Sequence, residues 1–455
     1  MRYRSARPLH LLLGAVISCL VFGCSNSEGI DCAGAEIIAV VENSNNHIEK
    51  NAPPQESSSS EKHEESSSAK VIDYLPIDDS ESPYAGIPRI VIETENYRQI
   101  RDRETEIPAK LQIWGERAPE SEVMDLTIRG RGNSTWWYPK KPYAIKFNKK
   151  QAFLGMPAAK KWVMLANYRD RTLIRNAVAF ELARKTSLAW TPSGKFVDVY
   201  LNRRFIGNYY ICEKIEVNDN RLELDEDSYL LEFDAHYDEE YKFKSTYNDL
   251  PVNIKYPKEP DSVQIERIKN FIDSAELAFG ANANDSCFLD YVEATSFADY
   301  FIIYALATNG ELEHPKSLFV YKDGKKKLSA GPVWDFDFDT FDIKKRGFTN
   351  RNGTFVKQFL QKKSFHKTLQ ERWSATQKGF LEIYSFIDSL SSYLEKSNSL
   401  NTKIWPIKID KYNVGDEHKS FEEAVKMLKD ALSSQYSELD NLIGPAGELQ
   451  KLYEF

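Results

Sequence analysis

The chain has 455 residues, of which 42% are hydrophobic and 13% aromatic, and a formal net charge of −8 at pH 7. This length leaves room for one large domain or several ordinary ones, and the hydrophobic content is that of a globular protein with a substantial core. A general nucleic-acid-binding protein is not expected, because the overall field of an acidic chain repels polyanions.

Residues 1–24 have the composition of an export signal. Three arginines within the first seven residues precede an apolar stretch, residues 11–22, which is short for a transmembrane helix. The stretch ends at Val21-Phe22-Gly23-Cys24, which resembles a bacterial lipobox and so implies lipid attachment to Cys24. Ordinary signal-peptide cleavage is the alternative, because Phe22 is bulkier than the residue usual there. We expect a lipoprotein of the bacterial cell envelope that faces the periplasm or the cell exterior.

Residues 25–82 are predicted to form a flexible tether. Residues 55–69 consist almost wholly of serine and glutamate, and such a segment cannot bury enough apolar area to offset its ordering entropy. The tether would hold a globular domain away from a membrane surface. The few, widely spaced cysteines after the signal do not suggest a disulfide framework, and we expect mostly free, buried thiols.

From residue 87 onward, short runs rich in β-branched and aromatic residues alternate with turns, a pattern that predicts strands. The expected strands are residues 90–94, 110–114, 124–129, 143–147, 162–166, 196–200, 206–210 and 229–233. Within this region, a helix from Arg171 to about Lys185 is expected, with Asp170 as its N-cap.

After Pro260 the pattern becomes helical. Helices are expected at residues 264–279, 289–308, 355–360, 381–400 and 421–442, with a β-pair at residues 318–321 and 327–330. Strands followed by helices indicate an α+β class with two lobes, the first rich in β-structure and the second helical. Residues 83–345 would form the main domain, and residues 346–455 a helical region that completes or flanks the second lobe.

The segment 330–339 places three carboxylates at alternate positions. In an extended chain, residues two apart point to the same face, so Asp335, Asp337 and Asp339 would converge. Such hard oxygen ligands suit Mg²⁺, which favours one or two carboxylates together with substrate phosphates. The alternative is an edge strand with solvated acids.

A basic region surrounds the glycine-containing turn at residues 130–133. Arg129, Arg131, Lys140, Lys141 and Lys146 supply the positive charge, and backbone N–H groups of the turn could approach an anion. The turn is not a kinase glycine loop, because Thr135 stands where the third glycine belongs. The alternative is an ordinary strand–turn–strand.

Four segments, residues 126–147, 165–176, 197–216 and 308–337, together resemble the CotH kinase family of spore-coat-type protein kinases. The resemblance spans roughly residues 86–342, with the segments in the family's order. It implies a two-lobed, atypical protein-kinase-like fold that uses ATP and Mg²⁺ to phosphorylate Ser or Thr hydroxyls of exported proteins.

The resemblance also implies roles for individual residues. Lys146 would be the strand lysine that holds the nucleotide phosphates, with Glu181 or Glu213 as its ion-pair partner. Glu311 stands where the family has a catalytic aspartate, and Glu313 is the alternative base. Asp335 and Asp337 would bind the metal. The expected nucleotide-binding residues are Arg129, Arg131, Lys141, Lys146, Glu213 and Lys316.

Two other functions remain open from the sequence. The chain could be a catalytically weak or inactive kinase-fold module for surface binding or assembly, because Glu311 replaces the aspartate and ATP is scarce outside the cytoplasm. It could also be associated with carbohydrate or the cell wall, because the aromatic faces of Trp136, Trp137 and Tyr138 could stack on sugars. Simple packing over the lobe is the other interpretation of this triplet.

Overall fold

The structure is a computed structural model that describes residues 74–280, 283–312, 315–348, 354–406, 415–416 and 418–454. The predictions for the signal segment, for Cys24, for the tether up to residue 73 and for Glu313 lie outside these residues. Among the helices of the described part, none is both long and apolar enough to cross a membrane.

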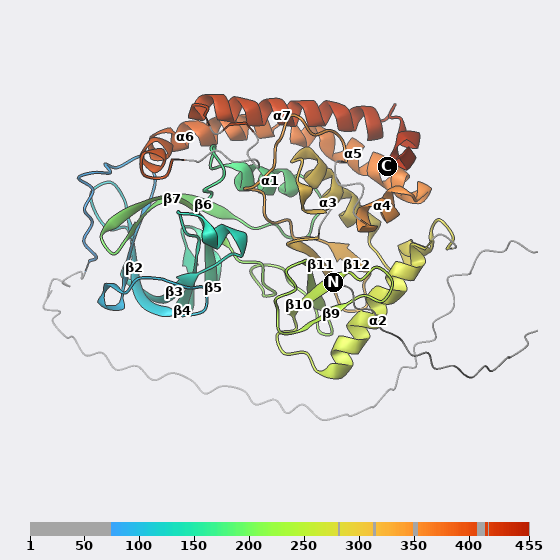
Figure 1. The fold of residues 1–455 in the computed structure, drawn as a ribbon, viewed down its shortest axis with the longest axis horizontal. Helices are drawn as coiled ribbons and strands as arrows, with labels where there is room; N and C mark the ends of the chain where they lie inside the picture. Colours follow the sequence, from blue (N-terminus) through green and yellow to red (C-terminus); the bar gives the residue numbers. More distant parts are fainter. Residues whose placement is uncertain are drawn as a thin grey trace, which may run out of the picture.

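Seven strands close into a barrel in the order β1-β2-β3-β4-β5-β7-β6, with β1 and β6 parallel and the other neighbours antiparallel (Figure 1). Alternation along each strand directs one set of apolar side chains inward. On β4, for example, Tyr143, Ile145 and Phe147 are buried in the barrel core, whereas Lys146 is exposed on the outer face. The strands are β1 (Arg89–Thr94), β2 (Ile107–Trp114), β3 (Met124–Gly130), β4 (Tyr143–Phe153), β5 (Met156–Leu165), β6 (Gly194–Leu201) and β7 (Arg204–Glu213).

A second sheet has five strands in the order β12-β11-β8-β10-β9, all antiparallel. Its strands are β8 (Tyr229–Phe233), β9 (Lys242–Lys244), β10 (Pro251–Tyr256), β11 (Leu318–Lys322) and β12 (Leu328–Ala330). It shares one hydrophobic core with α1 (Arg175–Arg184), α2 (Ser262–Ala278) and α3 (Ala294–Leu306). Helix α3 is apolar on nearly all sides and almost wholly buried, as expected of a helix inside a core.

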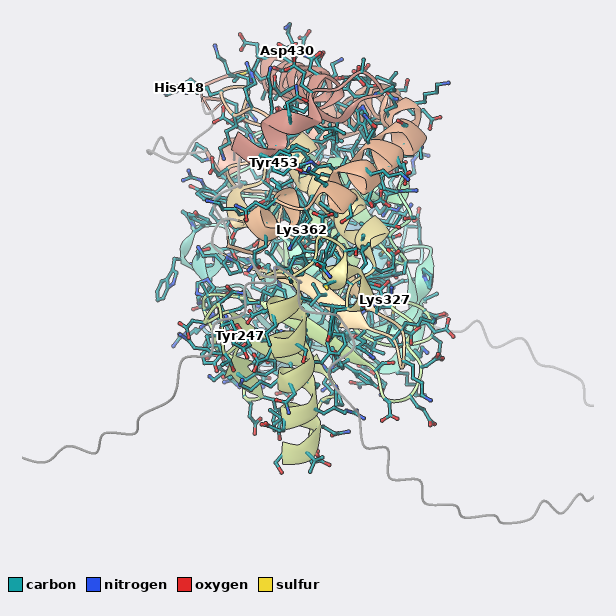
Figure 2. The ribbon with its side chains drawn as sticks, turned by 90° about the vertical axis from the view of Figure 1, so that its right-hand side faces the viewer. Tyr247, Lys327, Lys362, His418, Asp430 and Tyr453 are labelled. Atoms are coloured by element: carbon teal, nitrogen blue, oxygen red, sulfur yellow. The ribbon has the colours of Figure 1, made fainter. Side chains whose placement is uncertain are left out.

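The remaining helices are α4 (Thr354–Leu360), α5 (Lys363–Phe380), α6 (Ile383–Ile404) and α7 (Phe421–Ile443). Figure 1 shows α5, α6 and α7 as a layer along one side of the molecule. In the perpendicular view of Figure 2, Asp430 of α7 lies at one end and Tyr247, between β9 and β10, lies toward the other. Short 3-10 helices are η1 (Glu95–Tyr97), η2 (Ser134–Trp137), η3 (Cys287–Asp290), η4 (Gly310–Leu312) and η5 (Leu449–Glu454).

A buried polar network joins α6 to the barrel. The Lys140 ammonium donates to the backbone oxygen of Ala166 (2.7 Å), to that of Asn208 and to Asn401 Oδ1 (2.8 Å). Nearby, Ser397 Oγ donates to Asp198 Oδ1 at 2.6 Å. Because these groups have little contact with water, their hydrogen bonds fix the position of α6 against β6 and β7.

The mixed α+β class and most expected strands are confirmed. The helix expected from Arg171 begins only at Arg175, because Asp170 accepts hydrogen bonds from Thr172 and from the Arg175 backbone, which holds residues 170–174 in a turn. Strands β9 and β10 and helix α5 were not predicted. Cys212 is free and buried, as expected, whereas Cys287 is disulfide-bonded, which corrects the expectation of a free thiol there.

Candidate active-site cleft

A cleft of about 840 Å³ lies between the barrel and the second sheet. The outer faces of β3, β4 and β5 form one wall. Residues of β8, β10 and β11, together with the chain after β12, form the other. The volume is in the range of small-molecule binding sites, and both charged and apolar side chains line it. Among the sequence-predicted site residues, the cleft collects Arg129, Arg131, Lys146, Glu311, Lys316, Asp335 and Asp337.

Asp335 and Asp337 enter the cleft from the segment after β12. Their side chains are hydrogen-bonded to each other, and Asp337 is 8% exposed. The chain there is irregular and not extended, with φ of 68° at Asp335 and 51° at Asp339. These left-handed conformations break the two-residue alternation, so Asp335 and Asp337 converge as expected but Asp339 does not join them. Asp339 instead forms an ion pair with Lys345, at 3.0 Å between Oδ2 and Nζ.

The environment of this pair favours protonation. Burial raises the pKa of Asp335, while Arg131 opposes the rise. Burial, followed by the neighbouring Asp335, raises the pKa of Asp337 to about 7. Two adjacent carboxyl groups of this kind are a fitting donor set for a divalent cation, whose charge would offset their mutual repulsion. Within the described residues, no three Asp, Glu, His or Cys side chains form a complete metal site, so phosphate oxygens would have to supply further ligands.

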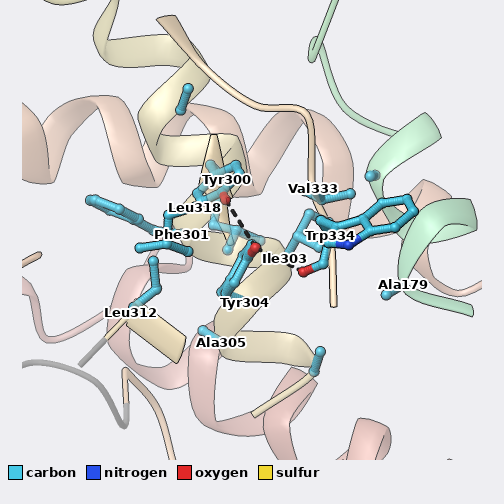
Figure 3. Packing of buried hydrophobic residues seen from close by; sticks show 14 of the residues in the cluster. Ala179, Tyr300, Phe301, Ile303, Tyr304, Ala305, Leu312, Leu318, Val333 and Trp334 are labelled. Atoms are coloured by element: carbon cyan, nitrogen blue, oxygen red, sulfur yellow. Dashed lines mark hydrogen bonds between the residues drawn. The ribbon is translucent and has the colours of Figure 1, made fainter. Parts of the chain in front are cut away.

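Buried amides and hydroxyls hold the backbone of this segment. Asn309 Nδ2 donates to the Asp335 backbone oxygen at 2.9 Å, and Asn309 Oδ1 accepts from the Glu311 N–H at 2.8 Å. Asn176 of α1 accepts from the Phe336 N–H at 2.9 Å. Figure 3 shows Tyr304 of α3 donating to the Trp334 backbone oxygen, with Tyr300 donating in turn to Tyr304. None of these positioning contacts was predicted from the sequence.

Glu311 is the first acidic residue of η4 and lines the cleft. Burial raises its pKa to about 8, and the nearby Asp335 and Asp234 add to the rise, whereas Lys316 opposes it. Asp234, buried directly after β8, was missed from the sequence. Its oxygens accept from the backbone N–H groups of His236 (2.7 Å) and Ser317 (3.3 Å).

The two arginines at the turn of residues 130–133, just before η2, differ in their contacts. The Arg131 guanidinium lies over the Trp334 ring, 5.8 Å from its centre, and is electrostatically coupled to Asp335 and Asp337. Burial lowers the pKa of Arg131, but from a value so high that the group stays charged. Arg129 also lines the cleft, and its guanidinium donates to the backbone oxygens of Arg103 and Gly130.

Lys146 projects from the outer face of β4 at the rim of the cleft. Its ammonium pairs with Glu106 Oε2 at 3.5 Å, and both side chains are nearly half exposed. The two expected partners are therefore corrected. Glu181 pairs with Arg184 and Lys185 on its own helix, and the buried Glu213 accepts from the Ser193 N–H at 2.8 Å. The pairing of β3 with β4 explains why Lys146 binds Glu106. Thr127 lies opposite Lys146, and its hydroxyl donates to the same glutamate.

Lys141 is not among the residues that line the cleft. Its ammonium donates to the Trp136 backbone oxygen at 2.7 Å and lies 5.3 Å from the centre of the Trp136 ring. In the aromatic triplet, Trp136 packs against the barrel core and Tyr138 stacks on Tyr168 with ring centres 5.5 Å apart, whereas Trp137 is 82% exposed. Two of the three rings are thus engaged in packing.

The fold and cleft define a protein with a closed barrel, a second sheet and a carboxylate pair facing basic residues. The family model "CotH kinase protein" matches residues 128–439, most of the chain. The chain therefore belongs to the CotH kinase family. The match continues beyond residue 345, through α5 and α6 into α7. No curated protein compared with the chain matches it.

Proposed function

We propose that this protein is an ATP- and Mg²⁺-dependent kinase that transfers the γ-phosphoryl group to Ser or Thr hydroxyls of exported proteins. The barrel would be the first lobe of a kinase-like fold, and the second sheet with its helices the second lobe. The observation that carries the proposal is the meeting of Asp335 and Asp337 with Arg131, Lys316 and Glu311 in one cleft. Phosphoryl transfer depends mainly on positioning and on charge neutralisation, which these groups can supply.

Asp335 and Asp337 would hold Mg²⁺, whose charge neutralises the phosphate oxygens when it is bound. Arg131 is placed to contact the same phosphates, because it is already coupled to both carboxyl groups. Lys316, coupled to Glu311 and Asp335, would contact them from the opposite wall. The turn at residues 130–133, where Gly132 has φ of 81°, would add backbone N–H donors.

Glu311 is the proposed general base. Its carboxylate would accept the proton of the acceptor hydroxyl as the hydroxyl oxygen bonds to the γ-phosphorus and the bond to ADP breaks. A base is most effective when its pKa lies near the working pH, and burial raises the pKa of Glu311 to about 8. Asn309 would fix this carboxylate relative to Asp335 through its two hydrogen bonds.

The cellular setting is part of the proposal. The positively charged start, the apolar stretch and Cys24 support a lipid-anchored protein of the cell envelope, with exported proteins as acceptors. The serine- and glutamate-rich tether would let the kinase domain reach acceptors away from the membrane.

A second candidate function is a binding or assembly module on the same scaffold. It is favoured by the glutamate at position 311, where the family has an aspartate. The two candidates differ in one property, which is turnover of ATP in the presence of Mg²⁺.

The test is transfer of label from γ-labelled ATP to protein by the full chain, with Asp335→Ala and Asp339→Ala variants. Asp339 is the matched control, because it lies in the same segment but pairs with Lys345. We expect Mg²⁺-dependent transfer that falls by about 10³-fold in Asp335→Ala and persists in Asp339→Ala. Equal transfer by all three proteins, or none by the wild type, contradicts the kinase proposal.

A further inference from the structure

A row of lysines crosses the barrel wall of the cleft. On β4, Lys146 is directly opposite Thr127 of β3 on one side and Lys161 of β5 on the other. Trp162 of β5 is opposite Glu213 at the end of β7, and these strands are antiparallel. Continuing the pairing by one residue therefore places Lys214 opposite Lys161. Lys146, Lys161 and Lys214 all line the cleft, and we call them the lysine row.

The lysine row has an unfavourable charge arrangement in the protein alone. Like charges directly opposite each other on antiparallel strands are destabilising. Lys146 has Glu106 at 3.5 Å, and Lys161 has Glu216 at 3.2 Å, but the other oxygen of Glu216 binds Arg221 at 3.0 Å. Among the described residues, none forms a hydrogen bond or ion pair with the Lys214 ammonium. The carboxylates therefore only partly balance the row.

Lys214 responds to this environment. Its pKa is lowered to about 8, chiefly by burial and to a smaller extent by Lys161, Lys258 and Lys255, against the opposing effect of Glu216. Lys255 of the opposite wall is itself occupied by Glu232 at 3.0 Å and by Glu239. The positive charge that remains available in this part of the cleft belongs to Lys214 and its neighbours on the barrel, and an anion placed there would relieve the repulsion.

The row is separated from the carboxylate pair along the barrel wall. Arg131, which is coupled to Asp335 and Asp337, lies four residues after Thr127, the residue that marks the row on β3. At a rise of about 3.3 Å per residue, Thr127 and Arg131 are about 13 Å apart along the chain. An extended peptide has the same rise. A residue four positions from an acceptor hydroxyl at the carboxylate pair would therefore reach the row.

We propose that the lysine row binds an acidic side chain of the acceptor polypeptide, about four residues from the hydroxyl that receives the phosphate. This inference rests on the proposed kinase function and names its substrate class, acidic serine-rich segments. The nucleotide phosphates would be held at the other end of the wall by Arg131 and the carboxylate pair, which leaves the row to the acceptor.

The chain carries a segment of this composition outside the described residues. Residues 55–69 contain seven serines and four glutamates, and a glutamate follows a serine by four residues in two pairs, Ser57 with Glu61 and Ser60 with Glu64. Its charge complements the row. This segment therefore supplies a natural probe for the acceptor site, whether it is presented in the same chain or by another copy.

The experiment compares two synthetic peptides as probes. One has the sequence of residues 55–69, and the other has Gln in place of all four glutamates. Binding to the full chain is measured by fluorescence anisotropy without nucleotide, and transfer is measured with ATP and Mg²⁺. We expect the acidic peptide to bind about tenfold more tightly and to be the better acceptor, as the loss of one or two charge-assisted hydrogen bonds implies.

Two variants test the lysines directly. Lys161→Glu with Lys214→Glu should abolish the preference for the acidic peptide, and Lys161→Ala with Lys214→Ala should weaken it if the charge reversal fails to fold. Lys326→Glu with Lys367→Glu is the matched control, since both lysines are more than 70% exposed and lie outside the cleft. The control should keep the wild-type preference.

The outcomes separate this inference from the proposed function. Equal transfer to both peptides leaves the kinase proposal intact and overturns the acidic-acceptor site. Preferential binding of the acidic peptide, with no transfer of label to either peptide or to protein, overturns the kinase function and leaves an acidic-peptide-binding cleft. Loss of the ATP-dependent thermal stabilisation in the Lys161 and Lys214 variants would assign the row to the nucleotide, which also contradicts the inference.

Discussion

The side-chain amide of Asn309 donates a 2.9 Å hydrogen bond to the backbone oxygen of Asp335. The same side chain accepts from the N–H of Glu311, so one buried residue spans the proposed base and a proposed metal ligand. The cleft thus depends on a residue that does not itself line it. Positioning of this kind is worth large factors in rate, because small displacements of reacting groups slow phosphoryl transfer.

Asn309→Ala is therefore expected to lower kcat by about 10²-fold, with a smaller effect on the KM for ATP. It should also reduce the free energy of unfolding by about 1–3 kcal/mol, because the buried Asp335 oxygen and Glu311 N–H lose their partner. Steady-state kinetics and urea unfolding measure the two effects. Unchanged kcat in a folded variant contradicts the positioning role.

Gly132→Ala should weaken ATP binding. Gly132 has φ of 81°, which strains any other residue, and a Cβ there would also clash with Thr135 Oγ1, so the turn at residues 130–133 would be disturbed. Gly155→Ala is the matched control, because Gly155 has a similar φ of 75° but nothing lies within 4 Å of the position that its Cβ would take. We expect the Kd for ATP to rise about tenfold in the first variant only, as measured by calorimetry. Equal affinities would show that the turn does not contact the nucleotide.

Lys140→Ala should destabilise the protein by about 3–5 kcal/mol, because it removes a positive charge near the buried Asp198 and the hydrogen bonds that Lys140 donates to three buried oxygens. Lys141→Ala changes the adjacent residue, whose ammonium contacts only Trp136 among the described residues, and should cost far less. Denaturant unfolding of both variants tests whether the network of α6 and the barrel stabilises the fold. A similar loss of unfolding free energy in Lys140→Ala and Lys141→Ala would contradict this stabilising role of the network.

His366 gives a pH-dependent prediction. Burial lowers its pKa below the ordinary value of 6.5, while the Leu360 backbone oxygen opposes the shift. The unfolded chain therefore binds the proton first as the pH falls, so the contribution of His366 to stability is present above pH 6.5 and is lost at lower pH. The melting temperature of His366→Gln should fall less than that of the wild type between about pH 7 and about pH 5. His418→Gln, at an exposed site, should follow the wild type.

Much of the fold follows from local patterns in the sequence. Alternating residues identified most barrel strands, and the long apolar run of α3 identified a buried helix. Closure of the barrel could not be predicted, because β1 pairs with β6 across more than 100 residues. Strand β9 has only three residues, too few for a period to show.

Some residues of the candidate site could be predicted from the sequence, and others could not. Asp335, Asp337, Glu311 and Arg131 belong to segments whose composition marks them, and the structure places all four in one cleft. Asp234 and Asn176 were missed because isolated polar residues beside a strand or on a helix carry no local signal. The partner of Lys146 depends on how β3 and β4 are paired. The orientation of Asp339 depends on left-handed backbone at Asp335 and Asp339. The alternation of residue types in the sequence reveals neither feature.

The most direct test of the proposed nucleotide site is the thermal stability of the full chain with ATP, with and without Mg²⁺, for wild type and Asp335→Ala. Ligand that binds only the folded state must stabilise it, by about 2.7 kcal/mol at a hundredfold excess over Kd. We predict a rise in melting temperature that requires both ATP and Mg²⁺ and disappears in Asp335→Ala. No shift in the wild type at millimolar ATP and Mg²⁺ would contradict a nucleotide site in this cleft.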